Sequence, residues 1–280
     1  MHAVVTGRRV AWYRNAASDS TLARATNPVA PMRIAVLSDV HGNLLALEAV
    51  LADLVRRSPD LMVNLGDCVS GPLHARDTAE VLLALEMPTI AGNHERQLLT
   101  QTLAEMGPSD RRAADELRAE HWGWMETLPS TAWFADGVFA CHGTLESDLP
   151  YLLEDVDKGR HRPVDAAAVA IRVAGCEAQV ILCGHSHQPR IVPLGDGRLV
   201  VNPGSVGLQA FTWDQPVPHV MATGSPHARY ALLDRHRDGW RAELVRVPYD
   251  WDSAADLAAA RGRADWAEAL RSGQLESRWS

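Results

Sequence analysis

Two histidines separated by a single residue follow an apolar run that ends in Gly184. In extended backbone, residues two apart point to the same side, so His185 and His187 are expected to face one small volume at the edge of a sheet. A neutral imidazole is a common ligand of divalent metals. Such a pair taken alone is more often a surface feature than a metal site. A metal site is therefore predicted only if the rest of the chain supplies further ligands.

Further ligand types follow other short apolar runs, again beside a glycine. They are Asp39 and His41 after 33–38, Asp67 after 61–65, Asn93 after 87–91, and His142 after 137–141. Carboxylate, imidazole and amide together suit borderline ions such as Mn²⁺, Fe²⁺, Zn²⁺ or Ni²⁺, of which we favour Mn²⁺. Seven ligands are too many for one ion that keeps an open position. They fit two divalent ions that share a carboxylate.

A pair of divalent ions predicts phosphate chemistry. Two ions about 3.5–4 Å apart can clamp the attacking and leaving oxygens of an in-line displacement, and they lower the pKa of bound water. Their charge of +4, less Asp39, Asp67 and a bridging hydroxide, leaves +1 to attract a phosphate. Hydrolysis of a phosphate ester is the reaction expected of such a centre.

The elements that carry these residues predict an α/β fold. A strand over 33–38, a helix over 44–55 with Asn43 as its N-cap, and a strand over 61–65 form a βαβ unit. Ligands gather beyond the carboxyl ends of strands in such sheets. Further elements are expected as follows: helix 77–85, strand 87–91, a helical region to Leu128, strand 137–141, helix 165–174 and strand 179–183.

The C-terminal third has a different pattern. The segments 190–194 with 199–202, and 228–233 with 240–247, read as two hairpins, which suggest an antiparallel sheet beside the first. A final helix is expected over 253–271. Trp122, Trp124 and Trp133 are interpreted as core aromatics.

Residues 32–280 are expected to form one domain, and residues 1–31 a disordered N-terminal extension. That extension is rich in arginine and lacks the apolar segment of a secretory signal, and Met32 is a possible alternative start.

Composition narrows the class of protein. The 280-residue chain has a net charge of −8 and no basic block, which argues against a nucleic-acid partner. No apolar run reaches the roughly 18 residues needed to span a membrane. The four cysteines include no CxxC pair, so a reducing compartment, the cytoplasm, is predicted. The oligomeric state does not follow from the sequence.

Five motifs, taken in order, resemble those of the calcineurin-like metallophosphoesterase superfamily. They are Asp39–Val40–His41, Gly66–Asp67, Gly92–Asn93–His94–Glu95, His142–Gly143 and Gly184–His185–Ser186–His187, and the resemblance extends from about Met32 to Val247. The segment that follows the fifth motif is also similar to that of small bacterial and archaeal phosphodiesterase-type members. It reads Asn202–Pro203–Gly204–Ser205–Val206–Gly207. The resemblance implies a four-layer αββα sandwich of two mixed sheets flanked by helices.

The resemblance also implies roles for individual residues. Asp39, His41 and His187 would bind the first metal, Asn93, His142 and His185 the second, and Asp67 would bridge them. A bridging hydroxide would attack phosphorus. His94 would contact the phosphate together with Asn93, and would protonate the leaving oxygen as general acid. Glu95 is expected to orient a neighbouring histidine.

Two departures from the family pattern bear on the substrate. Protein phosphatases and dinucleoside tetraphosphatases carry arginines where this chain has Ser70 and Ala91. Their absence argues against those two activities, although Arg76 or Arg96 could replace them. A small phosphorylated substrate such as a nucleotide is therefore expected, and a phosphodiester rather than a monoester. The alternative to an enzyme is a protein with the same fold that acts as a non-catalytic scaffold.

The second departure is the segment 206–227, which is longer than the compact turn expected after the Asn-Pro-Gly-Ser-Val-Gly sequence. A long irregular loop is often a lid or a binding loop. A plain surface excursion is the other interpretation.

Overall fold

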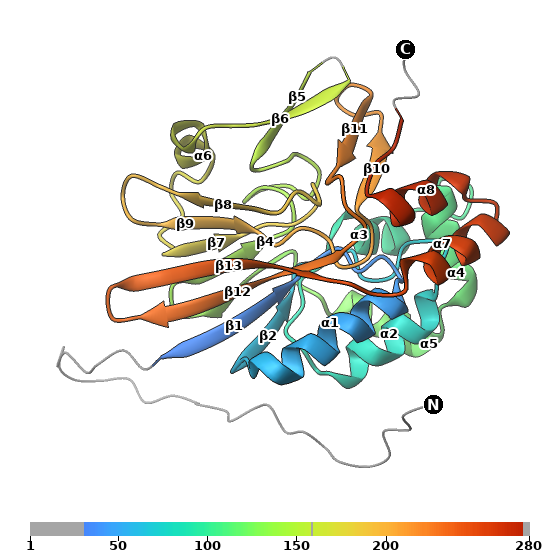
Figure 1. The fold of residues 1–280 in the computed structure, drawn as a ribbon, viewed down its shortest axis with the longest axis horizontal. Coiled ribbons are helices and arrows are strands. Elements are labelled where there is room, and N and C mark those ends of the chain that lie inside the picture. Colours follow the sequence, from blue (N-terminus) through green and yellow to red (C-terminus); the bar gives the residue numbers. More distant parts are fainter. Residues whose placement is uncertain (1–30, 158, 277–280) are drawn as a thin grey trace.

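The computed structural model describes residues 31–157 and 159–276 (Figure 1). Its first sheet has the strand order β13-β12-β1-β2. The strands are β1 (Met32–Leu37), β2 (Leu61–Asn64), β12 (Ala228–His236) and β13 (Gly239–Val247). β1 and β2 are parallel and are joined through helix α1 (Leu44–Arg57), while β12 is antiparallel to β1. The Asn43 side chain accepts a hydrogen bond from the Ala46 amide, as an N-cap does. The predicted βαβ unit is confirmed.

The second sheet has the order β3-β4-β7-β9-β8. Its strands are β3 (Thr131–Ala135), β4 (Val138–Cys141), β7 (Val180–Leu182), β8 (Arg190–Pro193) and β9 (Leu199–Asn202). β4, β7 and β9 are parallel. His142 and His185 follow β4 and β7, so both emerge at the same edge of this sheet.

The two sheets pack face to face, and helices cover their outer faces. Ile34, Val63, Val138, Leu182 and Val201 belong to the core between the sheets. Helices α1 and α2 (Ala75–Ala84) cover the first sheet, and α6 (Ala166–Arg172) covers the second (Figure 1). This arrangement confirms the four-layer αββα fold.

The remaining described elements are α3 (Asn93–Thr100), α4 (Pro108–Glu116), α5 (Ala119–Glu126), α7 (Trp251–Ala260), α8 (Ala264–Ser272), and the two-stranded ribbons β5 (Glu154–Asp157) with β6 (Arg160–Pro163) and β10 (Ala210–Trp213) with β11 (His219–Ala222). Of these, α3, α4, α8 and β10 line a cavity at the edge where the ligands emerge.

The expectation that the two C-terminal hairpins form a separate antiparallel sheet is wrong. The hairpin β8–β9 extends the second sheet, and β12–β13 extends the first. β9 buries Val201 between the sheets and Val200 under α6. A strand that is apolar on both faces is best buried inside an existing covered sheet, which explains the difference.

Three local predictions also differ from the structure. Residues 87–91 form only an isolated bridge between Thr89 and Asn64, since Pro88 lacks the amide that a longer ladder needs. The final helix is broken into α7 and α8 at Gly262, whose φ is 77°. The segment 206–227 contains the ribbon β10–β11 and is not irregular.

Of the three tryptophans expected in the core, Trp122 and Trp124 pack against the core on the helical side. Trp133 is 56% exposed and meets the ring of Phe139 edge to face. The prediction was wrong for Trp133, because it lies on β3, the edge strand of the second sheet.

The extension predicted for residues 1–31 lies, apart from Pro31, outside the described residues. No helix in the described part of the chain is long and apolar enough to cross a membrane. All four cysteines are unpaired, and Cys68, Cys141 and Cys183 are buried.

Candidate metal centre

Five of the predicted ligands have left-handed backbone. The φ angles of Asp39, His41, Asp67, His185 and His187 are 55°, 52°, 54°, 65° and 56°. Such conformations cost about 1–3 kcal/mol each in a non-glycine residue and occur where a site requires them. The turn at His185 and His187 is therefore not extended, so the geometric reason first given for pairing them was wrong.

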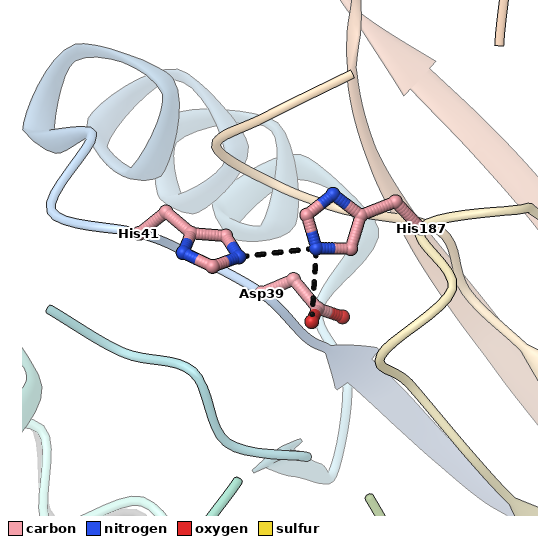
Figure 2. Close-up of side chains that lie close together, drawn as sticks. All are labelled: Asp39, His41 and His187. Atoms are coloured by element: carbon pink, nitrogen blue, oxygen red, sulfur yellow. Dashed lines mark hydrogen bonds and ion pairs between the residues drawn. The ribbon is translucent and has the colours of Figure 1, made fainter. Parts of the chain in front are cut away.

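Asp39, His41 and His187 form a first buried cluster (Figure 2), and their ligand atoms lie within 4.8 Å of one another. The Nε2 atoms of the two histidines are 3.0 Å apart, and that of His187 is 3.2 Å from Oδ1 of Asp39. Nδ1 of His41 donates to the Ser70 carbonyl, and Nδ1 of His187 donates to the Leu208 carbonyl.

These carbonyl contacts fix the tautomers of both histidines. A carbonyl can only accept, so the hydrogen is on Nδ1 and the lone pair is on Nε2. Two lone pairs then face each other beside Oδ1 of Asp39, a buried atom with no hydrogen-bond partner among the described residues. A cation between these three atoms would satisfy all of them. The cluster thus fits a divalent metal on its own geometry.

Asp67, His142 and His185 form a second buried cluster. Nδ1 of His142 donates to the Leu65 carbonyl, and its Nε2 lies 3.2 Å from Oδ2 of Asp67 and 3.2 Å from Oδ1 of Asn93. His185 has the opposite arrangement. Its Nε2 donates to the Leu149 carbonyl, which leaves Nδ1 as the atom available to a metal.

Asp67 lies between the two clusters. Its Oδ2 atom is 3.2 Å from Nε2 of His142 and 3.9 Å from Nε2 of His41. Its Oδ1 atom accepts a hydrogen bond from the His94 amide at 3.0 Å. The structure therefore brings all seven predicted ligands together in two groups, with His185 in one and His187 in the other.

Burial and neighbouring charge affect these histidines in opposite ways. Burial, with His187 beside it, lowers the pKa of His41 to about 4, and burial, with His142 beside it, lowers that of His185 to about 3. Burial also opposes protonation of His142, but Asp67 and Asp39 outweigh it and raise the pKa to about 10. A proton and a divalent cation would compete for Nε2 of His142.

Glycine is required at two positions because the site is so closely packed. A Cβ atom on Gly92 would lie 2.7 Å from the Asp67 backbone nitrogen and closer still to its carboxylate. A Cβ atom on Gly184 would overlap the Ser38 hydroxyl, which itself donates to Oδ2 of Asp39. Any side chain at either position would displace a candidate ligand.

Glu95 has a role that the sequence interpretation assigned wrongly. Its buried carboxylate accepts hydrogen bonds from the backbone amides of Asp67, Cys68 and Gly92, each at 2.8 Å. It contacts no histidine in this way. Since Glu95 is the third residue of α3, its side chain folds back to the amide before the helix and reaches the Asp67 turn as well. It therefore holds the backbone that presents Asp67.

His94 lies at the rim of the centre. Its Nδ1 atom donates to Oδ1 of Asp110 at 2.7 Å, and its ring meets that of His41 edge-on at 5.4 Å. Burial lowers the pKa of His94. The carboxylates of Asp67 and Asp110 have the larger, opposite effect, and the pKa is raised to about 9. Asp110 was missed from the sequence, where it resembles any acidic residue in the first turn of a helix.

A cavity of about 390 Å³ opens from the centre. One wall is formed by Gln97 of α3 and by Gln101, which directly follows that helix, and a second by Phe211 and Trp213 of β10. The aromatic rings of that second wall pack on candidate ligands: Phe211 is 4.7 Å from His187, and Trp213 is 5.0 Å from His185, between ring centroids. The segment 206–227 thus lines the cavity through β10.

The two arginines considered as replacements for the missing pair lie outside the cavity. Arg96 binds Asp148 through two hydrogen bonds, and Arg76 pairs with Asp77 and Glu80. Neither lines the cavity, but Arg263, beside Trp266 at the start of α8, does. No pattern in the sequence points to Arg263, which lies 168 residues after Glu95, the last residue of the Gly92–Glu95 motif (263 − 95).

Comparison with known proteins decides the family. Residues 32–224 match the calcineurin-like phosphoesterase superfamily domain. The chain belongs to this superfamily. Members are phosphoesterases, so the protein is a metal-dependent phosphoesterase, as the resemblance implied.

Similar proteins span nearly the whole described fold. The chain is 25% identical to the uncharacterized protein MJ0912 of Methanocaldococcus jannaschii over 259 residues, which are 83% of this chain and 94% of the relative. A metallophosphoesterase structure from Sphaerobacter thermophilus superposes with a TM-score of 0.67 at 25% identity and covers 88% of this chain and 100% of that one. The hypothetical protein PH1004 of Pyrococcus horikoshii OT3 gives 0.65 at 17% identity, covering 87% and 99%, and shares the fold.

Below the centre, Glu154 is a buried carboxylate that weakens the fold above acidic pH. It is 4% exposed, and neither of its oxygens has a well-formed hydrogen bond among the described residues. Burial raises its pKa from 4.5 to about 7, although Ser186, Arg190 and Arg172 partly oppose this. The folded chain therefore binds this proton more tightly than the unfolded chain, and stability is lost as pH rises from about 4.5 through 7.

Glu154→Gln should raise the free energy of unfolding at pH 8 by about 2–3 kcal/mol, because it removes the cost of ionising a buried acid. At pH 5 the variant and the wild type should differ little. Urea unfolding of the chelator-treated protein at both values of pH measures this, with the exposed Glu177→Gln as the control. An equal difference at both values of pH would contradict the assignment.

Proposed function

We propose that the protein hydrolyses phosphodiesters at a two-metal centre, with His94 as the general acid. The observation that carries this proposal is the pair of buried clusters in which carbonyl contacts direct unprotonated histidine nitrogens toward carboxylate oxygens. Asp39, His41 and His187 would hold one ion. Asn93, His142 and His185 would hold the other, and Asp67 would contact both.

When bound, the two ions would activate water and polarise the phosphate, and we favour Mn²⁺ for this N/O ligand set. The chain's own residues supply the rest. Glu95 fixes the turn that presents Asp67, and the Asn93 amide would face a phosphate oxygen. Asp110 keeps a hydrogen on Nδ1 of His94, so that Nε2 can carry a proton to the departing oxygen.

The charges of the cavity favour a diester over a monoester. Outside the ligands and His94, Arg263 is the one basic side chain that lines it among the described residues, and Asp265 already pairs with Arg263. A monoester dianion would bring one more negative charge without a matching cation. The same shortage disfavours protein phosphatase or dinucleoside-polyphosphatase activity, since those substrates require more cationic contacts.

The test is hydrolysis of bis-p-nitrophenyl phosphate and p-nitrophenyl phosphate by chelator-treated protein, with and without added Mn²⁺. We expect activity only with metal, and kcat/KM for the diester at least about tenfold higher, because unmatched like charge is costly at a desolvated site. Asp238→Asn, at an exposed turn, serves as a control that should behave as wild type.

Each other outcome has a clear meaning. Preference for the monoester would contradict the diester assignment. No metal-dependent turnover of either ester would favour the non-catalytic scaffold.

A further inference from the structure

The start of α8 closes one side of the cavity. Arg263, Asp265 and Trp266 line it. These residues lie beyond residue 224, where the match to the superfamily domain ends. The superfamily match does not cover this wall, and its chemistry bears on which leaving group the cavity can accept.

Arg263 is held rigidly. Its Nε and Nη2 atoms donate to the two carboxylate oxygens of Asp265 at 2.9 and 2.8 Å, and Nη1 donates to the Ser109 hydroxyl at 2.8 Å. Its guanidinium also lies over the ring of Trp266, 5.4 Å from the ring centroid. Each Nη atom has a second hydrogen, so the side chain keeps donors beyond these three contacts.

The position of Arg263 relates it to the leaving group. Its partner Ser109 precedes Asp110, whose carboxylate binds Nδ1 of His94. Trp266, on the other side, meets the ring of His41 edge-on at 6.0 Å. If His94 donates a proton to the departing oxygen, the departing group lies in this part of the cavity. Arg263 then borders the leaving group.

The surroundings of Arg263 are acidic. Glu105, Asp110 and Asp265 also line this cavity, against the single guanidinium. The amides of Gln97 and Gln101 offer neutral hydrogen bonds on the α3 wall. A leaving group with a further phosphate would meet three carboxylates, and the two basic side chains there, Arg263 and His94, are already paired with Asp265 and Asp110. An uncharged alcohol with hydrogen-bonding groups would not be repelled.

We propose that Arg263, held by Asp265 and Trp266, is a specificity-determining residue that binds an uncharged leaving alcohol of nucleoside size. The acidic groups around it disfavour a leaving group that carries another phosphate. This inference rests on the proposed diesterase function and deepens it. A cavity of about 390 Å³ falls in the range of small-molecule sites, and its Phe211 and Trp213 wall offers aromatic surface to a base.

The substrates for the test are a dinucleoside monophosphate and the same compound phosphorylated at both free ends, so that either leaving nucleoside is charged. With the Mn²⁺-loaded full chain, we expect kcat/KM to be at least about tenfold higher for the first compound. Arg263→Gln should lower that kcat/KM by about 10–100-fold, the usual effect of losing a hydrogen bond from a charged donor. Arg241→Gln, at an exposed arginine of β13 that does not line the cavity, should stay within about twofold.

A binding measurement separates this inference from the reaction itself. The His94→Ala variant, titrated calorimetrically with the dinucleoside monophosphate, should bind it about tenfold more tightly than His94→Ala/Arg263→Gln does. Arg263→Lys retains the charge but not the paired geometry, and should lose binding in part. Thermal unfolding of each variant checks that the fold is intact.

Two results would overturn the inference. One is a wild type that hydrolyses both dinucleotides equally well. The other is an Arg263→Gln variant that matches wild type in kcat/KM and in binding. Failure of the wild type to hydrolyse any diester would instead contradict the proposed function, and the binding titration would still decide whether Arg263 contacts the nucleoside.

Discussion

Replacing His94 by alanine should lower kcat for a diester with an alkyl leaving group by about 10²–10⁴-fold, the usual contribution of general acid catalysis. The loss should be much smaller for a p-nitrophenyl leaving group. A weakly basic phenolate departs without a proton, whereas an alkoxide needs one. The substitution removes the whole imidazole: Nε2, the atom that would carry the proton, and Nδ1, which donates to Asp110 at 2.7 Å.

Steady-state kinetics on methyl and p-nitrophenyl diesters of one nucleotide would measure this difference. Asp110→Asn should give an intermediate loss with the same leaving-group pattern, since Asp110 acts through His94. His236→Ala, at an exposed position, is the matched control. Equal losses for the two leaving groups would show that His94 binds phosphate and does not donate a proton.

Asp67→Asn should lower the activity by at least about a thousandfold, because the variant removes the ionised ligand that lies between both clusters. The amide keeps the shape of the side chain but not its charge. His185→Ala should weaken the second ion selectively, since the structure places His185 away from the Asp39 group.

The number of metal ions bound per chain after dialysis, measured by elemental mass spectrometry, distinguishes the two variants. We expect about two ions per wild-type chain, about one in His185→Ala, and fewer than one in Asp67→Asn. Wild-type metal content and turnover in Asp67→Asn would exclude a bridging role.

The residue types at the ends of the strands made most of the fold predictable. Apolar runs such as 33–38 and 61–65 are buried parallel strands, and polar side chains after them meet at one edge of the sheet. The hairpins could be predicted as hairpins, but not their sheets, because the choice depends on which covered sheet has room for a strand apolar on both faces.

The geometry of the site was harder to predict from the sequence than the fold. His185 and His187 were paired on the assumption of extended backbone, but both are left-handed, and they point into different clusters. Nothing in the residue types shows a left-handed histidine. The conformation is held by contacts from distant segments, such as the Leu208 carbonyl on His187.

The supporting residues could not be found by spacing. Asp110 reaches His94 from another helix, and Arg263 lines the same cavity although it is 169 residues after His94 (263 − 94). Their roles come from packing among α3, α4 and α8, which no local pattern encodes.

The central claim is that two ions share this site through Asp67. A crystal structure of the Mn²⁺-loaded protein, with anomalous difference maps at the manganese edge, tests it most directly. The account predicts two peaks about 3.5–4 Å apart, with Asp67 contacting both, His187 on one and His185 on the other. A single peak, or one ion bound by both His185 and His187, would contradict it.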